Sequence, residues 1–143
     1  MFKHIDFKLL AVHIPGFKDS GDKKDFWEAI IAHSKIHRNN NLLILGDFNT
    51  GLDIDSEGVS FKHKEFMISL IELGFHDAWR LIHNNKKEFT WYSNKSNGFR
   101  LDYGFISNKE VVLNAYHTHK MRLEKITDHS GLIIELDLKS KTE

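Results

Sequence analysis

Two short apolar runs constrain the fold of this chain more than any other feature. Residues 9–12 (LLAV) and 42–45 (LLIL) are apolar at every position. A strand with one solvated face alternates apolar and polar residues, whereas a strand buried on both faces is apolar throughout. Both runs therefore predict strands that have a packed layer on each side.

Two helices are predicted between and after these strands. Residues 22–39 carry apolar side chains at helical spacing with lysines on the opposite face. The apolar face of this helix is formed by Phe26, Trp27, Ile30 and Ile31. Ser60 is expected to cap a second helix, which Gly74 ends.

The remaining apolar stretches predict further strands. The full set of expected strands covers residues 7–14, 42–45, 88–93, 100–107, 111–119 and 131–138. This order predicts the α/β (α+β) class, with a mixed six-stranded sheet and two helices on one face. Two helices can cover only one face of such a sheet, so another layer should cover the other face.

Composition excludes several kinds of protein. The chain has 143 residues, which suits a single domain spanning residues 1–143. Lys and Arg together number 20, as do Asp and Glu, so the net charge is zero, which argues against a purely electrostatic nucleic-acid binder. There is no cysteine, so disulfides and thiolate metal sites are excluded. No apolar run approaches the ~18 residues of a membrane span, and the N-terminus lacks a signal-peptide pattern, so we expect a cytoplasmic protein.

Polar residues with catalytic potential stand at or near the ends of the expected strands. They are His13, Asp47, Asn49, Asp102, Asp128 and His129. Asp47 and Asn49 are two positions apart after the second strand, so on an extended backbone they would point to the same side. Carboxylates, an amide and two imidazoles suit a hard divalent cation with oxygen ligands better than zinc, together with a histidine paired to an aspartate.

Taken one at a time, these residues also have ordinary structural explanations. Asp47 and Asp128 could cap turns, and Asp102 could pair with Arg100. His13 could be a surface histidine. The residues alone do not decide between the catalytic and the structural explanation. His117 and His119 are expected to be an exposed pair without function.

Four segments in order resemble the endonuclease/exonuclease/phosphatase superfamily, the group of exonuclease III, the abasic-site endonucleases and deoxyribonuclease I. The segments are LLILGDFN (42–49), GFHDAWRL (74–81), FTWYSNKSNGFRLDYGFIS (89–107) and ITDHSGLIIEL (126–136). The resemblance implies divalent-metal-dependent hydrolysis of phosphodiesters, with nuclease activity on DNA as the leading expectation.

The resemblance also assigns roles to residues. Asp47 would orient or deprotonate the attacking water, Asn49 would hold the phosphate, Asp102 would orient a histidine, and His129 would contact phosphate or transfer a proton. Mg²⁺ or Mn²⁺ would bind near Asp47, Asn49 and Asp128. The expected catalytic set is His13, Asp47, Asn49, Asp102 and His129, and the expected substrate contacts are Asn49, Trp91, Phe99 and Arg100.

The matched motifs belong to the C-terminal half of the family, whose complete fold stacks two sheets in a four-layer sandwich. We therefore expect either a homodimer that packs through an exposed sheet face, or a separate polypeptide that supplies the N-terminal half. His13 stands where exonuclease III and the abasic-site enzymes carry tyrosine, and it is more similar to the deoxyribonuclease I, sphingomyelinase and phosphatase branches. Phe99 and Leu101 match positions that hold an abasic sugar, whereas Thr90 replaces an aromatic residue.

Three functions follow from these patterns. A nuclease should gather Lys62, Lys64, Lys95 and Arg100 around the mouth of the site. A phosphoesterase acting on a lipid or nucleotide would have these cations scattered. A catalytically incomplete binding or assembly module would have Asp102 too far from His129 for a hydrogen bond.

Overall fold

The computed structural model describes residues 6–16 and 23–138, so the ends of the expected single domain and the start of the first predicted helix, at Asp22, lie outside the described residues. The strands are β1 (Lys8–His13), β2 (Leu42–Asp47), β3 (His76–Asp77), β4 (Trp91–Tyr92), β5 (Gly98–Phe99), β6 (Asp102–Ile106), β7 (Val112–Thr118) and β8 (Gly131–Leu136). The helices are α1 (Lys24–His37), α2 (Lys64–Glu72), α3 (Ala78–His83) and α4 (Lys120–Leu123).

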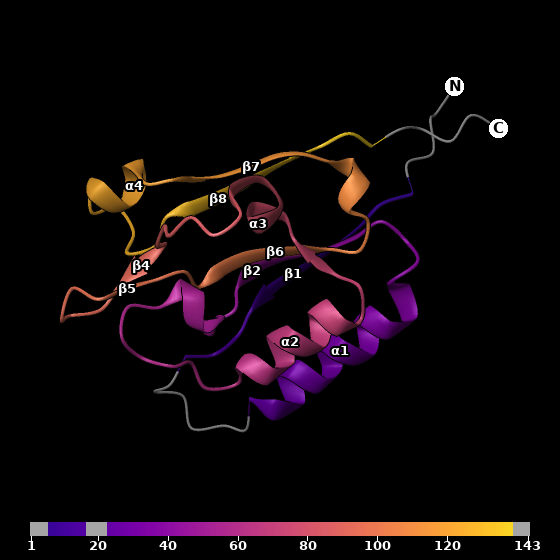
Figure 1. The fold of residues 1–143 in the computed structure, drawn as a ribbon, viewed down its shortest axis with the longest axis horizontal. Coiled ribbons are helices and arrows are strands. Elements are labelled where there is room, and N and C mark those ends of the chain that lie inside the picture. The colour runs from indigo at the N-terminus through magenta and orange to yellow at the C-terminus, as the bar shows by residue number, and fades with distance from the viewer. Residues whose placement is uncertain (1–5, 17–22, 139–143) are drawn as a thin grey trace.

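A mixed sheet of four strands forms the centre of the molecule (Figure 1). Its order is β1-β2-β6-β3; β1 runs parallel to β2, and β6 runs antiparallel to both β2 and β3. The α/β class and the mixed sheet with two helices on one face are confirmed. The expected number of strands in the sheet is wrong, because β7 with β8 and β4 with β5 form two separate pairs.

Helices α1 and α2 cover one face of this sheet (Figure 1). Trp27 of α1 stacks on Phe66 of α2 at 5.4 Å between ring centroids, and the same Trp27 contacts Phe48 just after β2. Phe26, expected on the buried face of α1, is 53% exposed instead. Helix α2 begins at Lys64 after the left-handed His63, so Ser60 is not its cap.

The β7–β8 pair and α3 lie across the opposite face of the sheet, where they bury Leu43 and Ile106 against Trp79 and Ala115. The close approach depends on Gly104 in β6, because a Cβ there would lie 2.2 Å from Cδ1 of Ile134 in β8. This second layer explains the apolar character of residues 42–45 on both sides. Within the described ranges, no helix has the length and apolar composition needed to cross a membrane.

Candidate active site

The strand register brings three of the expected site residues to one end of the sheet. His13 is the partner of Asp47 across β1 and β2, and Asp47 is the partner of Asp102 across β2 and β6. Neighbouring strands lie about 4.8 Å apart, so these side chains form a single row. The sequence prediction that strand ends gather the polar residues therefore holds for this row.

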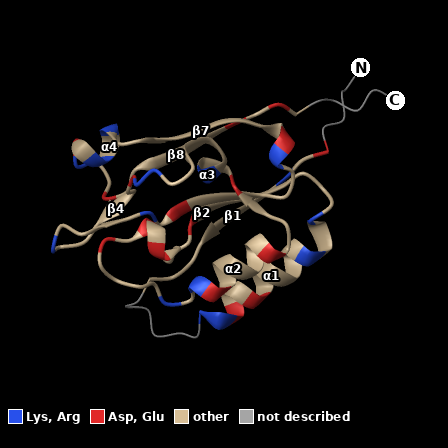
Figure 2. Cartoon of the chain, in the orientation of Figure 1, with Lys and Arg blue, Asp and Glu red and all other residues tan. Residues whose placement is uncertain are grey.

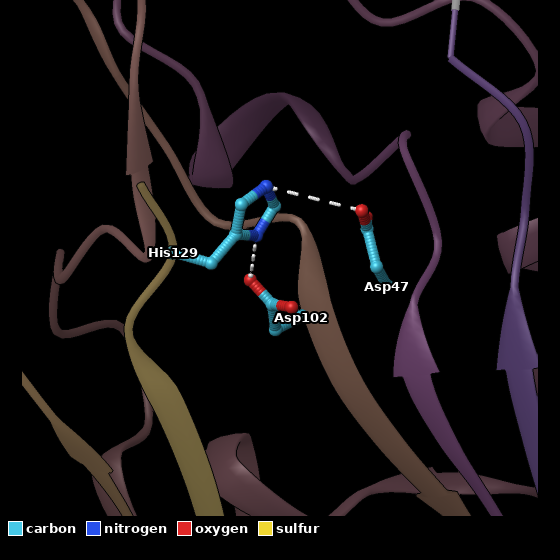
Figure 3. Close-up of side chains that lie close together, drawn as sticks. All are labelled: Asp47, Asp102 and His129. Atoms are coloured by element: carbon cyan, nitrogen blue, oxygen red, sulfur yellow. Dashed lines mark hydrogen bonds and ion pairs between the residues drawn. The ribbon is translucent and has the colours of Figure 1, made fainter. Parts of the chain in front are cut away.

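His129 reaches this row from the loop between α4 and β8. Its Nδ1 lies 2.9 Å from Oδ2 of Asp102, and Figure 3 shows the imidazole between the two aspartates. The hydrogen bond that His129 donates to Asp102 raises the pKa of His129 and outweighs the opposing effect of burial; the charges of Asp102, Asp47 and Asp128 add to the increase. The bond fixes a proton on Nδ1 and turns Nε2 toward Asp47.

Asp47 faces both histidines across short gaps. Its Oδ2 lies 3.9 Å from Nε2 of His129 and 3.8 Å from Nε2 of His13, whose side chain is 78% exposed. Both gaps are too long for a direct hydrogen bond. Burial, together with the charge of Asp102, raises the pKa of Asp47, even though a bond from the backbone N–H of Asn49 and the two histidines oppose the increase.

Asn49 contacts Asp47 through a turn and not through extended backbone. Strand β2 ends at Asp47, and Asn49 has a φ of 46°. Its N–H donates to Oδ1 of Asp47 at 2.8 Å, and its side-chain amide donates to Oδ2 of Asp47 at 3.2 Å and to the carbonyl of Ile14 at 2.6 Å. The expected proximity of Asn49 and Asp47 is present, but the extended geometry invoked for it is wrong.

The group most suited to a cation differs from the expected set of Asp47, Asn49 and Asp128. Among the described residues, Asp47, Asp102 and His129 offer ligand atoms that all lie within 4.8 Å of one another. Asp128 is exposed at the rim, where its Oδ2 accepts a hydrogen bond from Nε1 of Trp91 at 3.2 Å. Two carboxylates held close together fit a divalent cation, because the cation would relieve their repulsion.

A cavity of about 660 Å³ opens beside these side chains. Its polar wall includes His13, Asp47, Asn49, Asp128 and His129, and its apolar wall includes Val59, Phe61, Trp91, Phe99 and Leu101. Trp91 and Phe99 thus lie where a substrate would be contacted. The sequence reasoning missed Val59 and Phe61, because it placed this stretch at the start of a helix. The available signal was the pair of apolar residues, Val59 and Phe61, that follows Gly58 in a polar stretch.

Arg100 does not reach the cavity, and the expectation that it contacts substrate or pairs with Asp102 is wrong. Its side chain is 0% exposed and forms ion pairs with Asp55 and Asp77. Burial alone would lower its pKa, but Tyr103, Asp77 and Asp55 raise that pKa above the usual value. Its Nε, Nη1 and Nη2 atoms all donate to these two buried carboxylates.

The expectation for His117 is also wrong. Its ring is buried, stacks on Trp79 at 5.0 Å, and places Nδ1 3.0 Å from Oε1 of Glu88. Burial lowers the pKa of His117 to about 4. Thr90, where the family carries an aromatic residue, is buried, and its Oγ1 accepts hydrogen bonds from the N–H groups of Leu101 and Asp102 at 3.0 and 3.4 Å.

Several solved structures share this architecture. A 3′ phosphatase, NExo, from Neisseria, with product DNA hairpin bound, aligns with a TM-score of 0.76 at 20% identity, over 90% of this chain and 60% of its own. An AP endonuclease from Archaeoglobus fulgidus aligns with a TM-score of 0.76 at 24% identity, over 91% and 61%. An endonuclease/exonuclease/phosphatase family protein from Leptotrichia buccalis aligns with a TM-score of 0.53 at 18% identity, over 75% and 40%. The chain shares the fold of these three proteins.

This shared fold confirms, at the level of architecture, the resemblance drawn from the four motifs. The chain spans about 60% of the length of the Neisseria and Archaeoglobus proteins. At the level of sequence, no protein-family model and no curated protein matches it.

Proposed function

We propose that this chain hydrolyses phosphodiester bonds with the help of a divalent cation, and that its substrate is DNA. The proposal rests on one observation above all: Asp102 holds His129, and His129 faces Asp47 across a 3.9 Å gap at the wall of a cavity. The neighbours described as an AP endonuclease and a 3′ phosphatase with bound product DNA support this choice of substrate.

The proposed reaction uses Asp47 as the base. A single oxygen atom could contact both Asp47 Oδ2 and His129 Nε2 at ordinary hydrogen-bond lengths, so a water can be positioned there. Asp47 takes a proton from this water as the water oxygen attacks phosphorus and the bond to the leaving oxygen breaks. The leaving oxygen takes its proton from solvent.

His129 and Asn49 would act on the phosphate. A protonated His129, held by Asp102, donates from Nε2 to the phosphoryl oxygens as negative charge develops on them. Asn49 borders the same cavity and would orient the phosphate, while the exposed His13 would approach it from the mouth. These are the roles that the family resemblance assigns.

The cation would be Mg²⁺ or Mn²⁺, held by the carboxylate oxygens of Asp47 and Asp102. Hard divalent cations prefer such ligands, and the repulsion between the two carboxylates makes a cation favourable there. When bound, it would supply Lewis-acid polarisation of a phosphoryl oxygen. Asp128 could join from the rim.

A phosphoesterase that acts on a small nucleotide or lipid phosphoester is the second candidate, and the charge distribution favours it. No described residue lining the cavity is a lysine or arginine. Arg100 is buried, Lys64 pairs with Asp53 at 2.7 Å, and Figure 2 shows the Lys and Arg positions spread along helices and loops. The hydrogen bond between Asp102 and His129 argues against an inactive module.

The test is a substrate panel with Mg²⁺, Mn²⁺ or EDTA. It includes supercoiled plasmid, duplexes that carry an abasic analogue or a 3′-phosphate, and bis(p-nitrophenyl) phosphate. Asp47→Asn should lower kcat by about 10²-fold or more, whereas Asp25→Asn on the exposed surface of α1 should not. Wild-type protein that is folded and inert on every substrate would refute the proposal, and activity on the small ester alone would favour the second candidate.

We further propose that a second copy of the chain covers its remaining apolar surface. The β7–β8 pair and α3 cover part of the sheet face that the sequence predicted to be open, but Leu9 on β1 is still 57% exposed. On the outer side of the β7–β8 pair, Leu113, Tyr116 and Ile133 are also exposed. Strand β8 is apolar at four of its six positions and pairs with β7 alone among the described strands, so one edge is free to add a strand.

Light scattering after size exclusion tests this proposal at tens of micromolar. A mass of two chains that falls to one in Ile133→Lys supports it, with Ile36→Lys on the exposed side of α1 as the matched control. A monodisperse monomer would refute it and would leave a separate polypeptide, as the sequence also allowed, to cover the surface.

A further inference from the structure

A second cluster of polar side chains lies behind the proposed active site. Ser130, which follows His129, is buried, and its Oγ lies 2.7 Å from Nδ1 of His119 and 2.9 Å from Nε of Arg122. Nε2 of His119 lies 3.3 Å from Oε1 of Glu88. We refer to Glu88, His119, Arg122 and Ser130 as the Ser130 clamp.

The hydrogen bonds of the Ser130 clamp run in one consistent direction. Arg122 has only donors, so it donates to Ser130 Oγ, which leaves the hydroxyl proton free to be donated to Nδ1 of His119. With a proton on Nε2, His119 then donates to the Glu88 carboxylate. Burial would raise the pKa of Glu88, but bonds from Lys86 and His117 outweigh burial and hold that pKa at about 2, so the acceptor stays charged. Three hydrogen bonds thus join the four side chains of the clamp in sequence.

Two further contacts connect the Ser130 clamp to Asp102 and His129. The N–H of Ser130 donates to the carbonyl of Thr90 at 2.8 Å, and Thr90 Oγ1 accepts from the N–H of Asp102 at 3.4 Å. Asp102 in turn bonds His129, the residue before Ser130. These contacts form a closed ring of Asp102, Thr90, Ser130 and His129. The Ser130 side chain is bonded to two residues outside this ring, His119 and Arg122.

We propose that His119 is a positioning residue that, through Ser130, fixes His129 against Asp102. The loop that carries His129 has exposed residues from 123 to 128; its backbone hydrogen bonds over that stretch are short-range, and the side chain of Asp128 accepts one bond from Trp91. The side-chain bonds of Ser130 are buried and hold the loop directly after His129. The catalytic consequence of this positioning rests on the proposed function, whereas its structural consequence does not.

The structural test uses NMR of the ¹⁵N-histidine-labelled chain without substrate. The imidazole N–H of His129 bonded to Asp102 should give a slowly exchanging resonance, assigned by its loss in His129→Gln. His119→Ala should broaden or remove this resonance and speed exchange of the Ser130 amide by about tenfold, the factor expected from loss of one buried hydrogen bond. His119→Asn offers an acceptor near the Nδ1 position, so it should restore both signals. His37→Ala at the far end of α1 is the control.

An unchanged His129 resonance and unchanged Ser130 exchange in folded His119→Ala would overturn the proposal. If that variant does not fold, Ser130→Ala takes its place, because it removes the bond between Ser130 and His119, together with the bond from Arg122, with little change in volume, and the same outcomes apply. On an active substrate, His119→Ala should lower kcat by about tenfold at constant KM, with recovery in His119→Asn. If the wild-type chain cleaves nothing while the NMR results hold, the proposed function fails and the positioning role of His119 stands.

Discussion

Replacing Arg100 by alanine should destabilise the protein more than any other single substitution at an arginine. The guanidinium donates to Asp55 from Nε at 2.8 Å and from Nη2 at 2.9 Å, and to Asp77 from Nη1 at 3.2 Å and from Nη2 at 2.5 Å. It also lies 4.2 Å and 4.9 Å from the ring centres of Tyr103 and Trp79. A single buried side chain thus satisfies two buried carboxylates and joins α3, β6 and the turn at residues 53–55.

The magnitude follows from the charges that the substitution would leave behind. Removal of one partner from a buried ion pair costs about 3–5 kcal/mol, because the other charge stays buried without compensation. Asp55 keeps Arg80 and Tyr103 as partners, and Asp77 keeps the N–H groups of α3, so we expect about 4 kcal/mol and not the sum for two pairs. Arg100→Lys keeps the charge without the two-pronged geometry and should cost about 2 kcal/mol.

Urea unfolding followed by tryptophan fluorescence measures this loss, and Trp79 lies within the network. For a slope of about 2 kcal/mol per molar urea, the midpoint of Arg100→Ala should fall by about 2 M. Arg38→Ala, at the exposed end of α1, should change the free energy of unfolding by less than about 0.5 kcal/mol. A loss below about 1 kcal/mol in Arg100→Ala would refute the assignment of this arginine to the core.

Three further predictions test the site and the packing. Mn²⁺ at tenfold its Kd should stabilise the wild-type chain by about 1.4 kcal/mol in thermal unfolding, and Asp47→Asn should abolish the shift; equal shifts would place the ion elsewhere. Burial lowers the pKa of His117 from 6.5 to about 4, so the unfolded chain binds the extra proton between these values and stability falls as pH falls through them. The free energy of unfolding from urea titrations should be about 2–3 kcal/mol lower at pH 4 than at pH 7 because of this histidine. His117→Phe should remove that part of the pH dependence. Gly46→Ala should lower the free energy of unfolding by at least about 3 kcal/mol, because φ is +150° and a Cβ would lie 1.8 Å from the carbonyl oxygen of Val12. Gly58→Ala is the matched control: its φ is +82° but nothing lies within 4 Å of the added Cβ, so the loss in the same assay should be about 1 kcal/mol.

The row of site residues was predictable from sequence because strand periodicity and strand ends are local properties. The apolar run before Asp47 located the end of β2, and the pattern around Asp102 located β6. Parallel pairing of β1 with β2 and antiparallel pairing of β2 with β6 then place His13, Asp47 and Asp102 side by side. His129 followed from the motif shared with the superfamily, since its loop has no periodicity of its own.

Arg100 was assigned wrongly although the sequence held the information needed. Phe99 and Leu101 flank it on extended backbone, where alternate side chains point to opposite sides. If Phe99 and Leu101 line the cavity, Arg100 must point away from it, as it does. The partners that make its burial tolerable, Asp55 and Asp77, are 45 and 23 residues away in sequence, and no local pattern connects them.

The position of the β7–β8 pair was beyond sequence reasoning for a different physical reason. Apolar residues on a strand indicate burial but do not say whether the strand joins the sheet edge or lies across its face. The choice depends on the absent side chain at Gly104, which lets Ile134 approach β6. The same layer buries His117 beside Trp79, so an error about the strands produced the error about this histidine.

The charge of the cavity wall is the physical reason why the proposed function includes a cation. Asp47, Asp102 and Asp128 lie at or beside the cavity, and the only basic side chains among its described lining residues are His13 and His129. A phosphate brought there adds further negative charge, and the pKa of Asp47 is already raised by burial and by Asp102. Imidazole protonation can offset part of this charge, since Asp102 raises the pKa of His129, but it cannot offset all of it. A divalent cation, as in the proposed function, would offset the negative charge that remains.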